Sequence, residues 1–319
     1  MSRAPRAWVL NLDAEHELER GSGYTPTRHM RSIVERERRR LLGPLVAPGD
    51  VLVTEAALAA GGAAIERARG LAGCAWSPTP RALDLLARAG AQVSQAPAFE
   101  VLRRVNARPF AAAVRSPLRA AGFAKQVVLS EDEVLAQVAR PAALGWLVRR
   151  TFGAAGRGRR RLHAGQPTPD ELTWIRASLR SGPLVIEPWV QVTREYTRSG
   201  SVAADGAVTI SAPCFQETSE HGAWLRTERA GRGAVHGSDD LRLEEATARA
   251  GEALAHAGYF GPFGIDAFRY RAGPGEPECL NPLSEINARL TMDWATAMTP
   301  GRGLLESTAE LLAPHGSPT

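Results

Sequence analysis

Apolar and polar positions alternate with two different periods along the first hundred residues. Short apolar runs at Trp8–Leu12 and Asp50–Thr54 predict strands, whereas the spacing of apolar residues from Met30 to Leu42 predicts a helix. A second helix is predicted from Pro80 to Ala89, because proline is favoured at the first helical position and a glycine follows. Strands that alternate with helices are typical of an α/β unit with a parallel sheet, which we expect over residues 1–103.

Two helix starts in the next part of the chain show a capping pattern. Ser130 and Thr168 are each followed three residues later by a glutamate, which is the form of a capping box. Between these two helices, the stretch from Trp146 to Leu162 reads as a strand, a glycine loop and a second strand. We expect a central subdomain over residues 104–183.

The last part of the chain reads mainly as strands with one long helix. Leu184–Ile186 is a short apolar strand, and the stretch from Ser201 to Ile210 is a hairpin with an Asp-Gly pair at its turn. The spacing from Leu241 to Ala257 predicts a helix that ends at a glycine. We expect a C-terminal subdomain over residues 184–319.

A further hairpin in this subdomain brings oxygen ligands together. Phe263 to Tyr270 is aromatic-rich and β-prone, and a turn in the glycines and prolines that follow places Asp266 opposite Glu285. Side chains two apart on a strand share a face, so Glu285, Asn287 and Arg289 all point to the same side. Magnesium prefers a few carboxylate or amide oxygens with water and substrate phosphates. We expect a magnesium site at Asp266, Glu285 and Asn287; the alternative is a surface hairpin with scattered polar residues.

Composition narrows the class of protein only slightly. The chain is 44% hydrophobic, which is enough for two or three modest cores. Its net charge is +5, but of the 39 basic residues only Lys125 is a lysine. This bias is more typical of GC-rich coding than of a nucleic-acid surface, so no nucleic-acid partner is expected.

The cysteines and the apolar runs predict a compartment. The three cysteines are far apart and make no CxxC pair, which indicates free thiols in a reducing compartment. No apolar run approaches the roughly 20 residues of a membrane span. The start of the chain leads into a strand-like run and not into a signal-peptide core. We expect a cytoplasmic protein with no membrane partner.

The glycine loop is a candidate phosphate contact. Gly153, Gly156 and Gly158 allow backbone N–H groups to close over phosphate oxygens, with Arg149 or Arg150 supplying positive charge. The loop lacks the lysine-serine ending of a P-loop. A flexible hairpin is one alternative, and an RNA-contacting basic arm is another, because an arginine-rich run follows the loop.

The apolar strand after the break near residue 183 ends in a candidate adenine site. Its residues are Glu187, Pro188, Trp189 and Val190. Their backbone groups are expected to face an adenine edge beside an apolar floor, and Glu195 is expected to accept hydrogen bonds from ribose hydroxyls.

The order of these features resembles the ATP-grasp superfamily over roughly residues 104–298. The most specific match is the stretch from Glu285 to Arg289, which looks like the Glu-x-Asn-x-Arg strand of biotin carboxylase-type members. Arg149 stands where most members carry a lysine, and Arg108 stands where another basic nucleotide contact is usual. Carbamoyl phosphate synthetase-like members use arginine at both places. Residues 1–103 then resemble the pre-ATP-grasp domain.

The resemblance also implies a reaction and roles for single residues. Glu187 and Glu195 match the hinge and the ribose-binding glutamate of D-alanine ligase-like members. A carboxylate would take the γ-phosphoryl group of ATP with Mg²⁺ bound, and an amine would attack the resulting acyl phosphate. Arg289 would hold the transferring phosphoryl group or the substrate carboxylate. The implied partners are a small-molecule or peptide-like carboxylate and an amine, and dimers are common in the family.

Residues 212–236 are the best candidate for a substrate loop or lid, and their arginines would suit a second carboxylate. An ordinary polar surface loop is the alternative for this segment. For the whole chain, a small-molecule kinase with the same fold is an alternative to the ligase. A non-catalytic nucleotide-binding or nucleic-acid-binding module is another.

Overall fold

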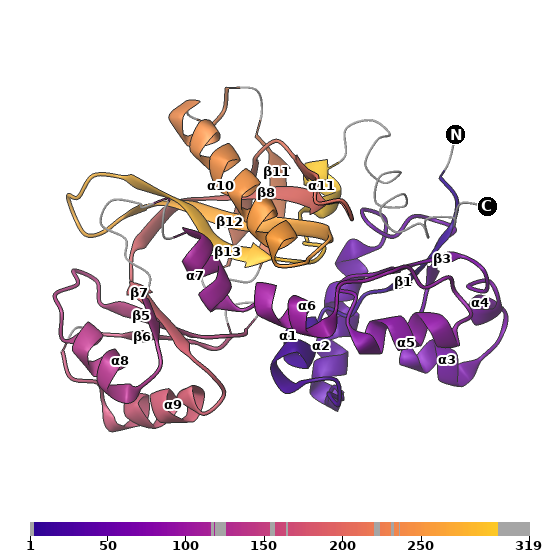
Figure 1. The fold of residues 1–319 in the computed structure, drawn as a ribbon, viewed down its shortest axis with the longest axis horizontal. Helices are drawn as coiled ribbons and strands as arrows, with labels where there is room; N and C mark the ends of the chain where they lie inside the picture. The colour runs from indigo at the N-terminus through magenta and orange to yellow at the C-terminus, as the bar shows by residue number, and fades with distance from the viewer. Residues whose placement is uncertain are drawn as a thin grey trace.

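A computed structural model of the chain shows three β-sheets, each with its own helices (Figure 1). The structure describes residues 3–115, 118, 126–153, 157–163, 165–219, 224–230, 233–235 and 237–298. The fold class is mixed α/β, as the sequence predicts. No helix in the described part of the chain is both long enough and apolar enough to cross a membrane.

The N-terminal unit is a parallel sheet with the strand order β2-β1-β3. Its strands are β1 (Arg6–Val9), β2 (Val51–Leu52) and β3 (Ala72–Ala75), and its helices are α1 (Ala14–Arg20), α2 (Arg28–Arg38), α3 (Glu55–Ala60), α4 (Ala63–Glu66) and α5 (Pro80–Arg88), with a 3-10 turn, η1 (Arg39–Leu41). Helix α5 begins at Pro80 as predicted, and its Leu85 and Leu86 share a core with Val9 and Val51. The predicted parallel α/β unit is therefore confirmed, although β1 ends before Leu12.

Two short helices lead from this unit into the rest of the molecule. They are α6 (Phe99–Val105) and α7 (Arg108–Arg115), and Figure 1 shows them between the three sheets. Leu102 and Val105 of α6 and Ala111 of α7 belong to the same buried cluster as Phe263 and Ile286. The burial of these apolar faces fixes the position of Arg108 at the first residue of α7.

The central unit is an antiparallel sheet with the order β4-β7-β5-β6. Its elements are β4 (Gln126–Val128), α8 (Glu131–Val138), β5 (Trp146–Arg150), β6 (Arg159–Leu162), α9 (Pro169–Leu179) and β7 (Leu184–Pro188). The two strands predicted on either side of the glycine loop are confirmed by β5 and β6, and residues 154–156 of the loop lie outside the described residues. Because β7 pairs with β4 and β5, a boundary at residue 183 would divide this sheet. We propose that the central subdomain ends after Pro188.

The two predicted capping boxes differ in the structure. At the start of α9 the Thr168 side chain accepts from the Glu171 N–H, and the Glu171 carboxylate accepts from the Thr168 N–H. At the start of α8 the Ser130 hydroxyl accepts from the N–H of Glu133, but the Glu133 carboxylate accepts from the residue before the cap. Both caps satisfy backbone N–H groups that the helix leaves without a partner.

The C-terminal unit is the largest sheet, with the order β11-β10-β8-β12-β13 and β9 paired to β8. Its elements are β8 (Gln191–Val202), β9 (Val208–Ile210), β10 (Cys214–Thr218), β11 (Trp224–Arg229), α10 (Gly237–His256), β12 (Gly261–Arg271), β13 (Cys279–Asn287) and α11 (Trp294–Met298). Helix α10 packs against the sheet through Ala246, Ala250 and Leu254. The hairpin of β8 and β9 and the helix before Gly258 are confirmed.

The structure corrects the expectation of a loop over residues 212–236. Residues 214–218 and 224–229 form the antiparallel strands β10 and β11 at the edge of the C-terminal sheet. The residues between and after these strands lie partly outside the described residues, among them His221 and Arg232. The polar side chains predicted on a loop are therefore carried largely by a sheet edge, where Glu217 and Arg226 pair across the strands.

The N-terminal and C-terminal units share a buried apolar cluster. Trp8 and Trp76 from the first unit pack with Leu290, Trp294 and Met298 from the last. The backbone N–H of Leu290 donates to the carbonyl of Trp76 at 3.1 Å. This contact brings the end of the parallel sheet beside the end of β13.

Candidate active site

A pocket of about 630 Å³ lies where the three units meet. Of the predicted site residues, those that line it are Arg108, Arg149, Gly153, Glu187, Pro188, Trp189, Val190, Glu195, Asp266, Glu285, Asn287 and Arg289. Arg150 and Gly158 are not among its lining residues, and Gly156 lies outside the described residues. A pocket of this size is in the range that holds small-molecule ligands and cofactors.

The predicted oxygen ligands lie together at the β12–β13 hairpin. Asp266 is the direct cross-strand partner of Glu285, as predicted. The Asn287 side-chain amide donates to Asp266 Oδ2 at 3.1 Å. The local geometry follows from the two-residue period of a strand, which puts Glu285 and Asn287 on one face.

Electrostatics at this hairpin favour a bound cation. Burial raises the pKa of Asp266 to about 8, and the nearby carboxylates Glu285 and Asp293 add to the rise. A divalent cation beside Asp266 and Glu285 would offset this repulsion, and the donors are of the type that Mg²⁺ prefers. Among the described residues no group of three His, Cys, Asp or Glu side chains is suited to hold a metal alone. Phosphate oxygens and water would therefore have to complete the coordination.

Two buried arginines connect this hairpin with the central sheet. Arg149 of β5 is 8% exposed; its Nη2 lies 2.9 Å from Glu187 Oε1, and its Nη1 lies 3.4 Å from Glu285 Oε2. Burial alone would lower the pKa of Arg149, but Glu187, Glu285 and Asp266 raise it above its ordinary value. Arg108 Nη2 lies 3.1 Å from Glu285 Oε1. Fixed positive charge thus stands directly beside the candidate metal ligands.

The structure distinguishes Arg149 from Arg150, which the sequence left open. Successive strand residues point to opposite faces, and only Arg149 lines the pocket. The Arg150 Nε donates to the Ser178 hydroxyl at 2.8 Å, and its guanidinium lies 5.5 Å from the centre of the Trp174 ring. Arg150 therefore holds α9 against the other face of the sheet.

The glycine loop approaches the pocket at Gly153. The Arg108 guanidinium donates to the carbonyls of Arg150 at 2.9 Å and Gly153 at 2.5 Å, which ties the loop to α7. A Cβ at Gly153 would lie 2.5 Å from the Arg157 carbonyl oxygen, so the loop requires glycine there. The Nε atoms of Arg108 and Arg149 are buried and have no hydrogen-bond acceptor among the described residues. These donors are suited to anionic ligand oxygens.

The segment at the end of β7 agrees only in part with the predicted adenine site. Its residues line the pocket, but the N–H of Trp189 donates to the Gly145 carbonyl at 2.8 Å. That N–H is therefore already satisfied and is not available to an adenine edge, which corrects this part of the expectation. Glu195 accepts from the Thr218 hydroxyl at 2.7 Å, so its second oxygen is the one left to face the pocket.

Arg289 is held by residues that the sequence did not single out. Its Nη2 lies 3.2 Å from Glu15 Oε1, and its guanidinium lies 5.8 Å from the centre of the Trp76 ring. Burial raises the pKa of Glu15, Arg289 opposes the rise, and Glu285 adds to it. The available signal was the position of Glu15 just after the first strand, because ligands often bind at the carboxyl ends of parallel strands.

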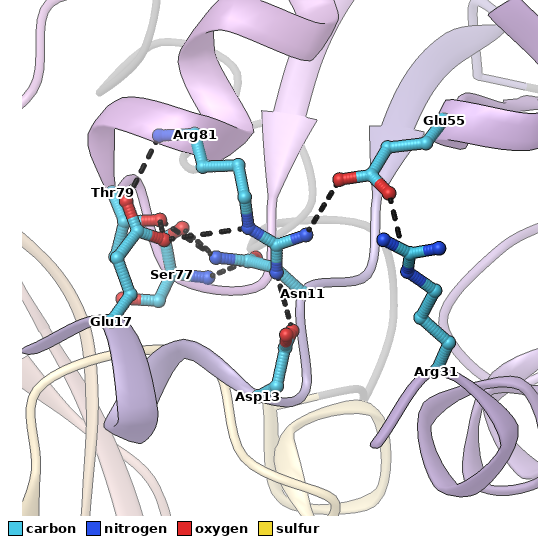
Figure 2. Close-up of polar contacts among 8 residues, drawn as sticks. All are labelled: Asn11, Asp13, Glu17, Arg31, Glu55, Ser77, Thr79 and Arg81. Atoms are coloured by element: carbon cyan, nitrogen blue, oxygen red, sulfur yellow. Dashed lines mark hydrogen bonds and ion pairs between the residues drawn. The ribbon is translucent and has the colours of Figure 1, made fainter. Parts of the chain in front are cut away.

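A polar network holds the helix that carries Glu15 (Figure 2). Glu17 is fully buried and accepts from the Thr79 hydroxyl at 2.7 Å and from the Arg81 N–H at 3.0 Å. Arg81 also donates to Asp13 at 2.6 Å. Figure 2 shows these side chains close together, with Asn11 among them, whose amide donates to the Thr79 hydroxyl at 3.0 Å. The network fixes α1, so that Glu15 reaches Arg289.

Comparisons with known proteins support the fold. No protein-family model matches the sequence, and no curated protein sequence matches it. Among solved structures, the β-γ-ATP complex of biotin carboxylase from Campylobacter jejuni is similar with a TM-score of 0.58 at 14% identity, over 99% of this chain and 72% of that one. The MgADP and bicarbonate complex of the biotin carboxylase domain of Hydrogenobacter thermophilus 2-oxoglutarate carboxylase is similar with a TM-score of 0.54 at 14% identity, over 75% of this chain and 51% of that one.

At 14% identity, these similarities show a shared fold. The similarity to the Campylobacter jejuni enzyme extends over nearly the whole chain, and so it includes the N-terminal parallel sheet as well as the two later units. The chain therefore shares the fold of these biotin carboxylase structures, which is the fold that the resemblance to the ATP-grasp superfamily implied.

Proposed function

We propose that the protein is an ATP-dependent ligase that joins a carboxylate to an amine through an acyl phosphate and releases ADP and phosphate. The observation that carries the proposal is the arrangement at the centre of the pocket. Asp266, Glu285 and Asn287 lie beside the guanidinium groups of Arg108 and Arg149. Oxygen ligands for a divalent cation next to fixed positive charge are what a triphosphate needs.

Each part of the pocket has a role in this proposal. Glu195 and the segment from Glu187 to Val190 would hold the nucleoside, and Gly153 with Arg108 and Arg149 would hold the phosphates. Mg²⁺ on Asp266, Glu285 and Asn287 would neutralise charge on the phosphate oxygens. The neighbouring structures were solved with ATP or ADP bound, and one with magnesium, which is consistent with this assignment.

The reaction needs positioning and charge neutralisation more than a protein nucleophile. A carboxylate oxygen of the donor attacks the γ-phosphorus, and the bond to the β-phosphate oxygen breaks to give ADP. The amine nitrogen then attacks the acyl carbon, phosphate leaves, and one proton is lost from the amine. Arg289 would stabilise the transferring phosphoryl group or the donor carboxylate, since its guanidinium is held at the pocket by Glu15 and Trp76.

An isotope-transfer experiment tests the mechanism directly. The protein is incubated with ATP, Mg²⁺ and a panel of amines and ¹⁸O-labelled carboxylates, and ADP, phosphate and condensed products are followed by mass spectrometry. We expect ADP formation that needs a carboxylate and an amine together, with one ¹⁸O atom transferred to phosphate. AMP with pyrophosphate, or phosphate without the label, would show that the proposed mechanism is wrong.

A pair of variants on one hairpin separates the site from the fold. Glu285→Ala should abolish turnover, because it removes the carboxylate that faces Asp266, Arg108 and Arg149. Glu276→Ala removes an exposed glutamate at the tip of the same hairpin and should leave turnover unchanged. If the Glu285 variant keeps full activity, the pocket is not the active site. A stable phosphorylated product without an amine would instead indicate a small-molecule kinase.

A further inference from the structure

Beyond the nucleotide residues, the pocket is lined between α2 and β11 by large apolar side chains, with Arg36, Glu37 and Arg40 beside them. This apolar end is lined by Met30, Ile33 and Val34 of α2, by Trp76, and by Trp224 and Leu225 of β11. None of these side chains carries a positive charge that suits a phosphate. Their number and size point to an apolar ligand group, because large apolar and aromatic walls contribute most of the binding energy of small-molecule sites.

The apolar end is closed by a contact between the N-terminal and C-terminal units. Arg40 donates to the backbone carbonyls of Trp224 and Leu225 at 3.0 and 2.8 Å. Its guanidinium lies 4.4 Å from the centre of the Trp224 ring. Arg40 and Arg36, the other arginine of this segment that lines the pocket, both pair with Glu37, at 3.2 and 2.9 Å.

One buried carboxylate at this end has no cationic partner among the described residues. Asp293 lines the pocket and is 2% exposed. It accepts hydrogen bonds from the hydroxyls of Thr197, at 3.1 Å, and Thr227. Two neutral hydroxyls are a weak counterpart for a buried negative charge, because burying an ion is costly without an opposite charge.

Two other carboxylates that line the pocket, Glu15 and Glu37, differ from Asp293 because each has an arginine partner. Glu15 is paired with Arg289, and Glu37 is paired with an arginine on each side of it. Asp293 accepts from Thr197, which is the cross-strand partner of Asp266, so Asp293 lies near the candidate metal ligands. A cationic ligand group held at Asp293 would therefore lie next to the position where the acyl phosphate forms.

We propose that the apolar end binds the amine substrate, that this amine carries an apolar or aromatic body, and that Asp293 holds its ammonium group and accepts one proton from it, which frees the nitrogen lone pair for attack on the acyl carbon. The inference rests on the proposed ligase function. The ammonium group would complete the charge balance of Asp293, while the body packs against Trp76, α2 and β11. Amines that also carry a negative charge would be disfavoured, because that charge would lie near the carboxylates of Asp266, Glu285 and Asp293.

Binding is measured by calorimetry on the full chain with Mg²⁺ and a non-hydrolysable ATP analogue present. Phenethylamine should bind at least about tenfold more tightly than ethanolamine, because only its ring can bury apolar area in the pocket. Leu225→Asp should remove this preference. Equal or reversed affinities in the unmodified protein would overturn the proposal.

The ammonium contact is tested with Asp293→Asn, which keeps an oxygen that can accept from a threonine hydroxyl. We expect phenethylamine affinity to fall about 10- to 100-fold, the range for a hydrogen bond between charged groups, with unchanged affinity for the nucleotide. Asp240→Asn, a half-exposed carboxylate outside the pocket, is the control and should change neither affinity. If Asp293→Asn weakens the nucleotide and not the amine, Asp293 belongs to the metal site and the proposal is wrong.

Failure of the ligase proposal gives a different result from failure of the inference about the amine. Nucleotide binding is titrated first, without amine. If the unmodified protein does not bind the nucleotide with Mg²⁺, the ligase proposal fails. If it binds the nucleotide and forms ADP with small polar or acidic amines, the ligase proposal stands and the inference about the amine is overturned.

Discussion

Replacing Asp266 with asparagine should stabilise the protein and abolish its activity. The pKa of this carboxyl is raised from 3.8 to about 8 by burial and by Glu285 and Asp293. The folded state therefore binds a proton more tightly than the unfolded state does. The free energy of unfolding should fall as the pH rises from about 4 to about 8. In this range the unfolded chain releases the proton of Asp266 freely, whereas the folded protein must keep the proton or bury a negative charge.

The size of the expected change in the free energy of unfolding follows from the rise in the pKa of Asp266. One pKa unit corresponds to about 1.4 kcal/mol, so the full rise would correspond to about 6 kcal/mol. Asp266 faces the pocket and is only partly buried, so water screens part of the repulsion. We expect Asp266→Asn to raise the free energy of unfolding by about 2–3 kcal/mol at pH 8 and to change it little at pH 4.

The assay is urea unfolding of both proteins, followed by circular dichroism, across this pH range. Mg²⁺ with an ATP analogue should stabilise the unmodified protein and have little effect on the variant, because the variant lacks a charged ligand. Asp84→Asn, an exposed residue of α5, is the control and should follow the unmodified protein. An Asp266→Asn variant that is less stable at pH 8, or that keeps the pH dependence, would refute the reasoning.

Three further predictions concern the arginines and the glycine loop. Arg149→Met should weaken nucleotide binding and lower the free energy of unfolding by about 3–5 kcal/mol, because the carboxylates of Glu187 and Glu285 lose their partner. Arg150→Met should leave the nucleotide affinity unchanged. Calorimetry measures the affinity of each variant, and urea unfolding measures its stability. Gly153→Ala should raise the KM for ATP in steady-state kinetics without changing the amine KM, and an unchanged ATP KM would contradict the proposed phosphate loop. Glu15→Gln should lower kcat more than it changes the KM for ATP, since Arg289 loses its charged partner; a change in ATP KM alone would contradict that role.

Local sequence patterns were enough to predict most elements. The capping box at Thr168, the helix start at Pro80 and the turn between β8 and β9 depend on residues within a few positions of one another. Asp266 and Glu285 are cross-strand partners as predicted, but the register next to the turn would place Asp266 opposite Leu283, and a β-bulge between Asp266 and Phe268 shifts it to Glu285. The residue types of the candidate ligands and their place on one hairpin were therefore predictable from the sequence, whereas their register depends on the bulge.

Tertiary structure decided what depends on contacts between distant segments. Glu15 and Arg289 are 274 positions apart, and they meet because the Trp76 region packs against the end of β13. The assignment of β7 to the central sheet and of β11 to a sheet edge likewise depends on partner strands elsewhere in the chain. A short apolar or polar run carries no information about its partner, since the same period fits many neighbours. The sequence alone thus determined the elements and the metal hairpin, whereas the packing of three units determined which side chains share the pocket.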